Sequence, residues 1–121
     1  METYQEFTAD MSKSEKREIK NRLYVVIEHC LKVKYVKGRL AEANVRGWNN
    51  SVQRERRALA ELFMEHPGLK PELTDELVDE VYRAAVAVVQ VEYRNVKFPR
   101  LRKLSMEDIV GKKVMLVVMK N

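Results

Sequence analysis

The sequence predicts an all-α fold, with three long antiparallel helices in an up-and-down bundle, a short C-terminal helix and an apolar tail. Apolar residues recur with the helical period of about 3.6 residues through three long stretches. Only 4 Gly and 3 Pro occur in 121 residues, in the expected linkers or at helix ends. A hydrophobic content of 45% with 34% charged residues is typical of a soluble helical protein. We therefore expect residues 1–121 to form one domain.

Several classes of protein are disfavoured by the composition. The longest apolar runs, such as Val114 to Met119, are too short to cross a membrane. No signal peptide opens the chain. One Cys excludes an internal disulfide and favours a reducing compartment. We expect a cytoplasmic protein that does not contact membranes.

The first helix is predicted over residues 12–36, after a short lead-in at residues 1–11. Ser12 with Glu15 has the pattern of a capping box at its start. One apolar stripe contains Ile19, Leu23, Val26, Cys30 and Val33. A second stripe, more than about 100° away around the helix, contains Tyr24, Ile27, Leu31 and Tyr35.

A helix with two apolar sides needs a packing partner on each side to bury both from water. Either the helix has two neighbours in its own bundle or a partner chain covers one side. The second stripe is thus a candidate interface for a homodimer or for another helical protein.

The second helix is predicted over residues 44–66, after a connection that includes Gly38 as the residue following the first helix. Trp48 opens its apolar stripe and should anchor the core. Glu55 falls inside this stripe and should pair with a cation of the bundle, because an unpaired buried charge is costly. The His66-Pro67-Gly68 sequence should end the helix.

The third helix is predicted over residues 71–93, with Pro71 in its first turn. One side of it should contain Leu73, Leu77, Val81, Ala84, Val88 and Val91. Val78, Ala85 and Val89 broaden this apolar side to nearly half of the circumference. The run from Ala84 to Val89 could be a buried strand, but its helical period favours a helix.

The C-terminal part begins with a break at Phe98-Pro99. Ser105 should cap a short helix over residues 105–110, which Gly111 closes. The tail at residues 112–121 either lies across the bundle, pairs as a strand with another chain, or is loose.

Four segments together resemble a family of bacterial helical proteins known as domain of unknown function family 29. They are HCLKVKY at residues 29–35, Trp48, SVQRERRALAELF at residues 51–63 and HPGLKPEL at residues 66–73. The family's mid-helix arginine matches Arg56, and the resemblance covers residues 12–110. Members usually have a further N-terminal helix, whereas only eleven residues precede the position that matches Ser12 in this sequence. The resemblance implies a helical bundle and no particular activity.

No catalytic, cofactor-binding or metal-binding group is predicted. His29 and His66 are isolated from other ligands, and His29 is expected to be a hydrogen-bonded packing residue. Cys30 falls in the apolar stripe, which favours an inert thiol. There is no glycine-rich phosphate loop. We therefore expect a protein that is not an enzyme.

Positive charge is concentrated near the C-terminus, although the net charge is only +5. Residues 94–121 carry 8 basic and 2 acidic side chains, whereas residues 70–93 carry 2 and 6. The candidate phosphate contacts are Arg94, Lys97, Arg100, Arg102, Lys103, Lys112 and Lys113. A self-associating interaction module is the leading hypothesis, and non-specific nucleic-acid binding through residues 94–113 is the alternative.

Overall fold

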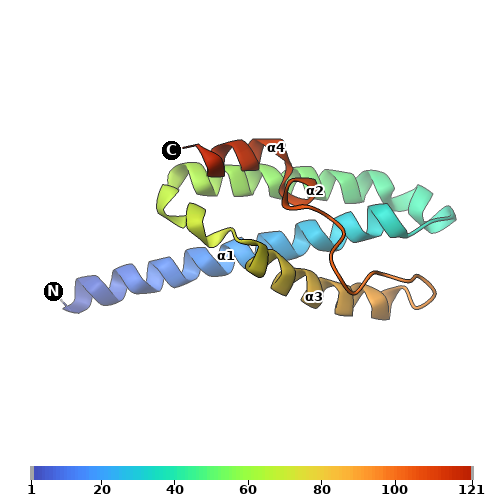
Figure 1. Ribbon diagram of the computed structural model, residues 1–121, viewed down its shortest axis with the longest axis horizontal. Helices are drawn as coiled ribbons and strands as arrows, with labels where there is room; N and C mark the ends of the chain where they lie inside the picture. The colour runs from blue at the N-terminus through green and yellow to red at the C-terminus, as the bar shows by residue number, and fades with distance from the viewer. Residues whose placement is uncertain (1, 121) are drawn as a thin grey trace.

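Helix α1 lies between the two other long helices of the bundle. The computed structural model describes the backbone of residues 2–120 and the side chains of residues 13–120. Its elements are α1 (Glu2–Tyr35), α2 (Arg39–Glu65), the 3-10 helix η1 (Pro67–Glu72), α3 (Asp75–Glu92) and α4 (Met106–Met119). α2 and α3 pack on α1, and α4 packs on α2 (Figure 1). Residues 2–120 contain no strand, and the predicted all-α class is confirmed.

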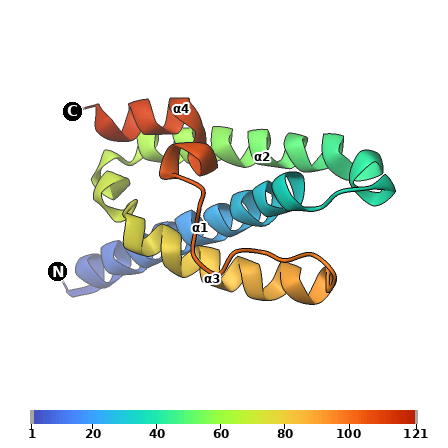
Figure 2. The same cartoon turned by 45° about the vertical axis from the view of Figure 1, so that its right-hand side comes forward.

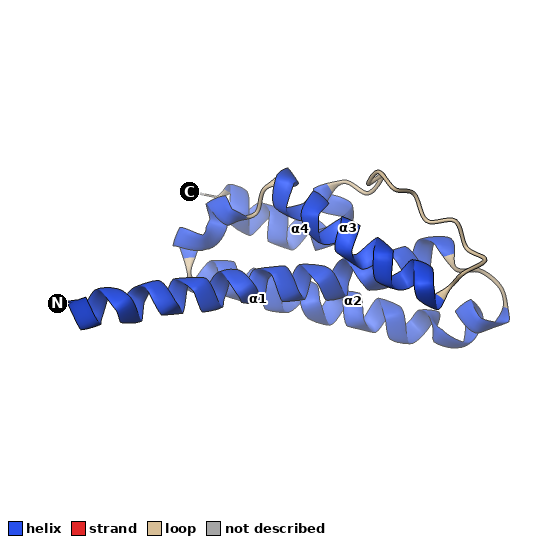
Figure 3. Ribbon diagram, turned by 90° about the horizontal axis from the view of Figure 1, so that it is seen from below, coloured by secondary structure: helices blue, strands red, loops and turns tan. Residues whose placement is uncertain are grey.

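α1 begins ten residues earlier than predicted. The helix runs from Glu2 through Ser12 without interruption, so the lead-in at residues 1–11 and the cap at Ser12 were wrong. The chain has no Gly or Pro before Gly38, and nothing therefore forces a helix to start or stop at Ser12. The first turns of α1 extend past the ends of the other helices (Figure 3).

Both apolar stripes of α1 are buried within the single chain. The side chains of Ile19, Leu23, Val26, Ile27 and Leu31 are 0% exposed. The neighbours that cover them are α2 and α3, so the first of the two alternatives for this helix is correct.

The homodimer interface predicted on Tyr24, Ile27, Leu31 and Tyr35 is wrong for the same reason. Ile27 and Leu31 belong to the core and offer no surface to a second chain. Tyr35 packs edge to face against Phe98, with ring centroids 6.0 Å apart, and Tyr24 is half-buried.

The turn between α1 and α2 is shorter than predicted. Gly38 has a φ of 93° and precedes the first residue of α2, Arg39. Residues 39–43 were placed in a connection, but they are Arg, Leu, Ala, Glu and Ala, which are all strong helix formers. The left-handed backbone of Gly38 lets the chain reverse over residues 36–38.

α2 ends where Pro67 predicted, because α2 stops at Glu65 and Pro67 opens η1. The third helix starts later than predicted, because Pro71 lies inside η1. The side chain of Thr74 caps α3 by accepting a hydrogen bond of 3.1 Å from the backbone N–H of Leu77.

The predicted cap and break of the C-terminal helix are both present. Ser105 and Asp108 form a capping box, and Gly111 interrupts α4 with φ 87° and ψ 165°. Beyond Gly111 the tail continues as helix to Met119 and lies along α2 (Figure 1). Val114 is 0% exposed, so the strand and the loose tail are both excluded for residues 112–119.

Gly111 and Gly47 provide a matched pair of Gly→Ala substitutions. Gly111→Ala should destabilise the protein by about 1–2 kcal/mol, because an L residue at positive φ is strained. Its Cβ would also lie 3.1 Å from Cδ of Arg56. Gly47→Ala lies within α2 with nothing near its Cβ and should stabilise by up to about 1 kcal/mol. Urea unfolding measures both, and equal effects would contradict this assignment.

Candidate functional site

Arg56 of α2 holds the broken helix α4. Its Nε donates to the carbonyl oxygen of Ile109 at 2.9 Å, and its Nη2 donates to that of Asp108 at 2.6 Å. These carbonyls lie in the last turn before Gly111, where a helix leaves its C=O groups without partners. The guanidinium therefore serves as a C-terminal cap supplied by another helix.

Gly111 and Arg56 fit together sterically as well. A Cβ at position 111 would stand 3.1 Å from Cδ and 3.3 Å from Nε of Arg56. Only glycine combines this close approach with the positive φ. Cys30 of α1 lies near the same guanidinium, and burial raises the pKa of its thiol above the ordinary value despite the nearby positive charge of Arg56.

The N-terminus of α4 is capped by Ser105 and Asp108, within one turn of the carbonyls that Arg56 binds. The carboxylate of Asp108 accepts a hydrogen bond of 2.9 Å from the backbone N–H of Ser105. The Ser105 hydroxyl accepts one of 3.0 Å from the backbone N–H of Asp108. The bonds with Ser105 lower the pKa of Asp108, and the charges of Lys34 and Arg56 lower it further. Asp108 is thus already bonded and not a free acid.

The bundle cation that the sequence predicted for Glu55 is present, and the structure identifies it as Arg22 of α1. The Glu55 carboxylate, 12% exposed, accepts a hydrogen bond of 2.8 Å from Nη1 of Arg22. This bond raises the pKa of Arg22 above its ordinary value. The pair links α1 to α2, and the expectation of a bundle cation is confirmed.

The remaining structural residues lie where the sequence placed them. Nδ1 of His29 is 2.7 Å from the carbonyl oxygen of Val25, one turn earlier in α1. Trp48 is buried in the core cluster, and Pro67 follows the end of α2. His29 and Trp48 are therefore packing residues, and Pro67 marks the end of α2.

Arg102 is not free to contact phosphate, as the sequence had suggested. Its side chain is 12% exposed and donates to Asp79 at 2.7 Å, to Asp75 at 2.9 Å and to the Leu104 carbonyl at 2.8 Å. Its bonds to Asp75 and Asp79 hold the segment after α3 against that helix. Arg102 must therefore be removed from the predicted nucleic-acid set.

The other predicted cations divide between two places. Arg94 and Arg100 line a cleft along α3, whereas Lys112 and Lys113 line another cleft between α2 and α4. Lys97 and Lys103 are exposed outside both. The stretch 94–113 is thus continuous in sequence but divided in space.

The predicted apolar side of α3 is confirmed in part, because the buried centre of the helix is rotated toward Tyr82. The buried residues are Val78, Val81, Tyr82, Ala85 and Val89. Ala84, Val88 and Val91, which were predicted to face the core, are exposed, with Val91 71% exposed. The signal that was missed is Tyr82, whose hydroxyl donates to the Pro99 carbonyl at 2.6 Å and orients this side inward.

Within residues 13–120, no three His, Cys, Asp or Glu side chains gather to hold a metal ion. No helix in the part of the chain described is long and apolar enough to span a bilayer.

The protein is an all-α bundle in which the last helix is broken at Gly111 and capped there by Arg56. The model of a family described as "Domain of unknown function DUF29" matches residues 3–115. The chain belongs to this family, and the resemblance inferred from the sequence is confirmed. No curated protein and no solved structure gives a match to the chain.

Arg56→Met tests the capping role of this arginine. The substitution keeps an apolar stem but leaves the carbonyls of Asp108 and Ile109 without their donor. We expect a loss of about 1–3 kcal/mol in the free energy of unfolding, the cost of an unsatisfied polar group. Arg57→Met removes the same charge from an exposed neighbour and should change stability by less than about 0.5 kcal/mol. Equal losses in chemical denaturation would rule out the cap.

Proposed function

We propose that the protein is a non-enzymatic helical interaction module that self-associates through the outward face of α3. The observation that carries this proposal is a row of exposed apolar residues on that helix. Val88 is 48% exposed and Val91 71%, and Ala84 and Ala87 lie exposed beside them. An exposed apolar strip of this kind is typical of a surface that binds another protein.

The spacing of the row suits a helical partner. Within α3, Glu80, Ala84, Ala87 and Val91 follow one another at intervals of four, three and four residues. This is the alternation with which helices pair along a narrow seam. Arg94 lies two residues beyond the end of the helix and lines the same cleft as Ala87 and Val91. The two alanines in the middle would let a second helix approach closely.

The charges at the two ends of the row favour a second copy of the chain. Glu80 lies at one end and Arg94 at the other, both exposed. An antiparallel pair of α3 helices related by a twofold axis near Ala87 would bring Glu80 of each copy close to Arg94, which follows the C-terminal end of α3 in the other copy. Glu80 already lies 3.0 Å from Lys20, but both side chains are about half exposed, so this contact is weak and can be shared.

The position of α3 leaves this face open. α1 lies between α3 and α2, so α3 is the outermost helix on its side of the bundle (Figure 2). A cleft of about 620 Å³ runs along its C-terminal half, lined by Val86, Ala87, Gln90, Val91, Arg94, Phe98 and Arg100. α3 spans 18 residues, so the seam is short and we expect micromolar affinity.

A charge swap in analytical ultracentrifugation tests the proposed dimer. Glu80→Arg alone or Arg94→Glu alone should place like charges opposite each other and shift the protein toward monomer. The double variant should restore the dimer, because only a symmetric pair exchanges both charges together. Val91→Glu should abolish it, since it places a charge in the apolar seam.

Glu61→Arg, at an exposed position of α2, is the control and should leave the mass distribution unchanged. A wild-type protein that stays monomeric up to millimolar concentration would refute the proposal. So would a double variant no more dimeric than its two single parents.

A further inference from the structure

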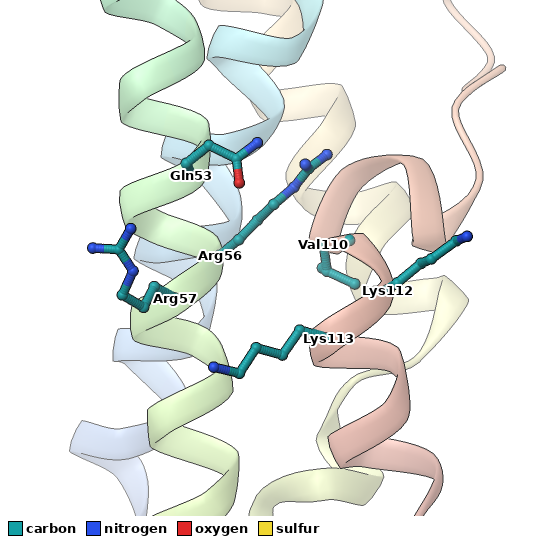
Figure 4. A pocket seen from close by; sticks show the side chains of 7 residues that line it. Gln53, Arg56, Arg57, Val110, Lys112 and Lys113 are labelled. Atoms are coloured by element: carbon teal, nitrogen blue, oxygen red, sulfur yellow. The ribbon is translucent and has the colours of Figure 1, made fainter.

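A second surface feature lies away from α3, where Gly111 breaks α4 against α2. A cleft of about 210 Å³ opens there, lined by Gln53, Arg56, Arg57, Val110, Gly111, Lys112 and Lys113 (Figure 4). Four of these seven residues are cationic and none is acidic. The self-association proposed above does not involve this cleft.

The cleft brings cations from two helices together. Figure 4 shows Lys113 extending from α4 toward α2, and Arg56 extending from α2 toward the first turn of α4. Arg57 follows Arg56 in α2, and its side chain extends away from α4. Lys112 points away from α2 and adds only to the local potential.

The cations at the mouth of the cleft belong to the exposed cations that hold no carboxylate within residues 13–120. Neither Arg57 nor Lys113 forms an ion pair within residues 13–120, and neither donates a hydrogen bond there. By contrast, the structural cations each hold a carboxylate: Lys16, Lys20, Arg22, Lys32 and Arg102. The Asp108 carboxylate offsets part of the charge of Arg56, but no acidic residue lines the cleft beside Arg57 and Lys113.

Arg56 also has bonding capacity left. A guanidinium has five N–H donors, and Arg56 uses one on Ile109 and one on Asp108. Because these two bonds fix its plane, the remaining donors are held in place without further loss of side-chain entropy. Gln53, on the preceding turn of α2, adds an amide to the lining.

We propose that this cleft binds the phosphate group of a small phosphorylated molecule. A phosphate accepts several charge-assisted hydrogen bonds at once, and an arginine fork with a lysine supplies them. The size agrees, because about 210 Å³ is below the range of about 300–1,000 Å³ for sites that enclose a drug-sized ligand. The cleft therefore fits a phosphate or pyrophosphate, with the rest of the ligand outside.

The arrangement favours such a ligand over a nucleic-acid backbone. A backbone needs cations along an extended track. Among the other exposed cations of the C-terminal region, Arg94 and Arg100 line the cleft along α3, and Lys97 and Lys103 lie outside both clefts. The four cations that line the cleft between α2 and α4 therefore offer one local point of attachment and not a track.

The test uses the full chain and inorganic pyrophosphate at constant ionic strength. The titration is followed by ¹⁵N–¹H correlation spectra. Pyrophosphate should shift the backbone amide signals of residues 110–114 and the guanidinium signals of Arg56 and Arg57. These shifts should saturate as expected for one binding site per chain. The variant Arg57→Gln/Lys113→Gln should bind at least about tenfold more weakly, the effect of losing charged hydrogen bonds.

Arg46→Gln/Lys103→Gln removes the same charge from exposed positions outside the cleft and should bind within about twofold of the wild type. Equal weakening of the two variants would overturn the proposal, as would an unsaturable response that sulfate or chloride reproduces. A short single-stranded oligonucleotide forms the second arm. If it binds while pyrophosphate does not, and its shifts extend to Arg94 and Arg100, the small-ligand site is refuted.

Discussion

The contact between Arg56 and the carbonyls of Asp108 and Ile109 determines how the last quarter of the chain attaches to the bundle. α4 is broken at Gly111, and a broken helix leaves carbonyls exposed at the break. Arg56 satisfies them from α2, and glycine at position 111 leaves room for its side chain. Ile109, Val110 and Val114 are then 0% exposed, so both segments of α4 add to the core.

Other long basic side chains likewise link elements that are distant in sequence. Arg22 joins α1 to α2 through Glu55, and Lys32 joins α1 to α3 through Glu92 at 3.0 Å. Arg102 fastens the segment after α3 to Asp79. A positive net charge therefore says little about a nucleic-acid surface in this chain, since several of its cations are structural.

Local signals in the sequence were sufficient for the class of fold and for several helix ends. Pro67 ended α2, Ser105 capped α4, and Gly111 broke it, because each acts on the backbone within a few residues. The start of α1 was missed because Ser12 has the pattern of a cap but also fits within a helix. Local pattern does not distinguish these two cases.

Long-range contacts could not be predicted in the same way. The carbonyl partners of Arg56 are 52 and 53 residues away, and periodicity contains no information about them. The rotation of α3 against the core was only partly predicted, because apolar residues cover nearly half of its circumference, and the Tyr82–Pro99 bond that orients it is also tertiary. Placing a dimer face on α1 failed because the two stripes of that helix have two neighbours within one chain.

Native-state hydrogen exchange of the α4 amides tests the role of Arg56 most directly. In the wild type, the amides of residues 113–119 should exchange with the same opening free energy as the core of α2, since α4 is part of one cooperative unit. In Arg56→Met they should open separately and at lower free energy, while the amides around Leu59 keep the global value. Unchanged protection of α4 in that variant would contradict the account.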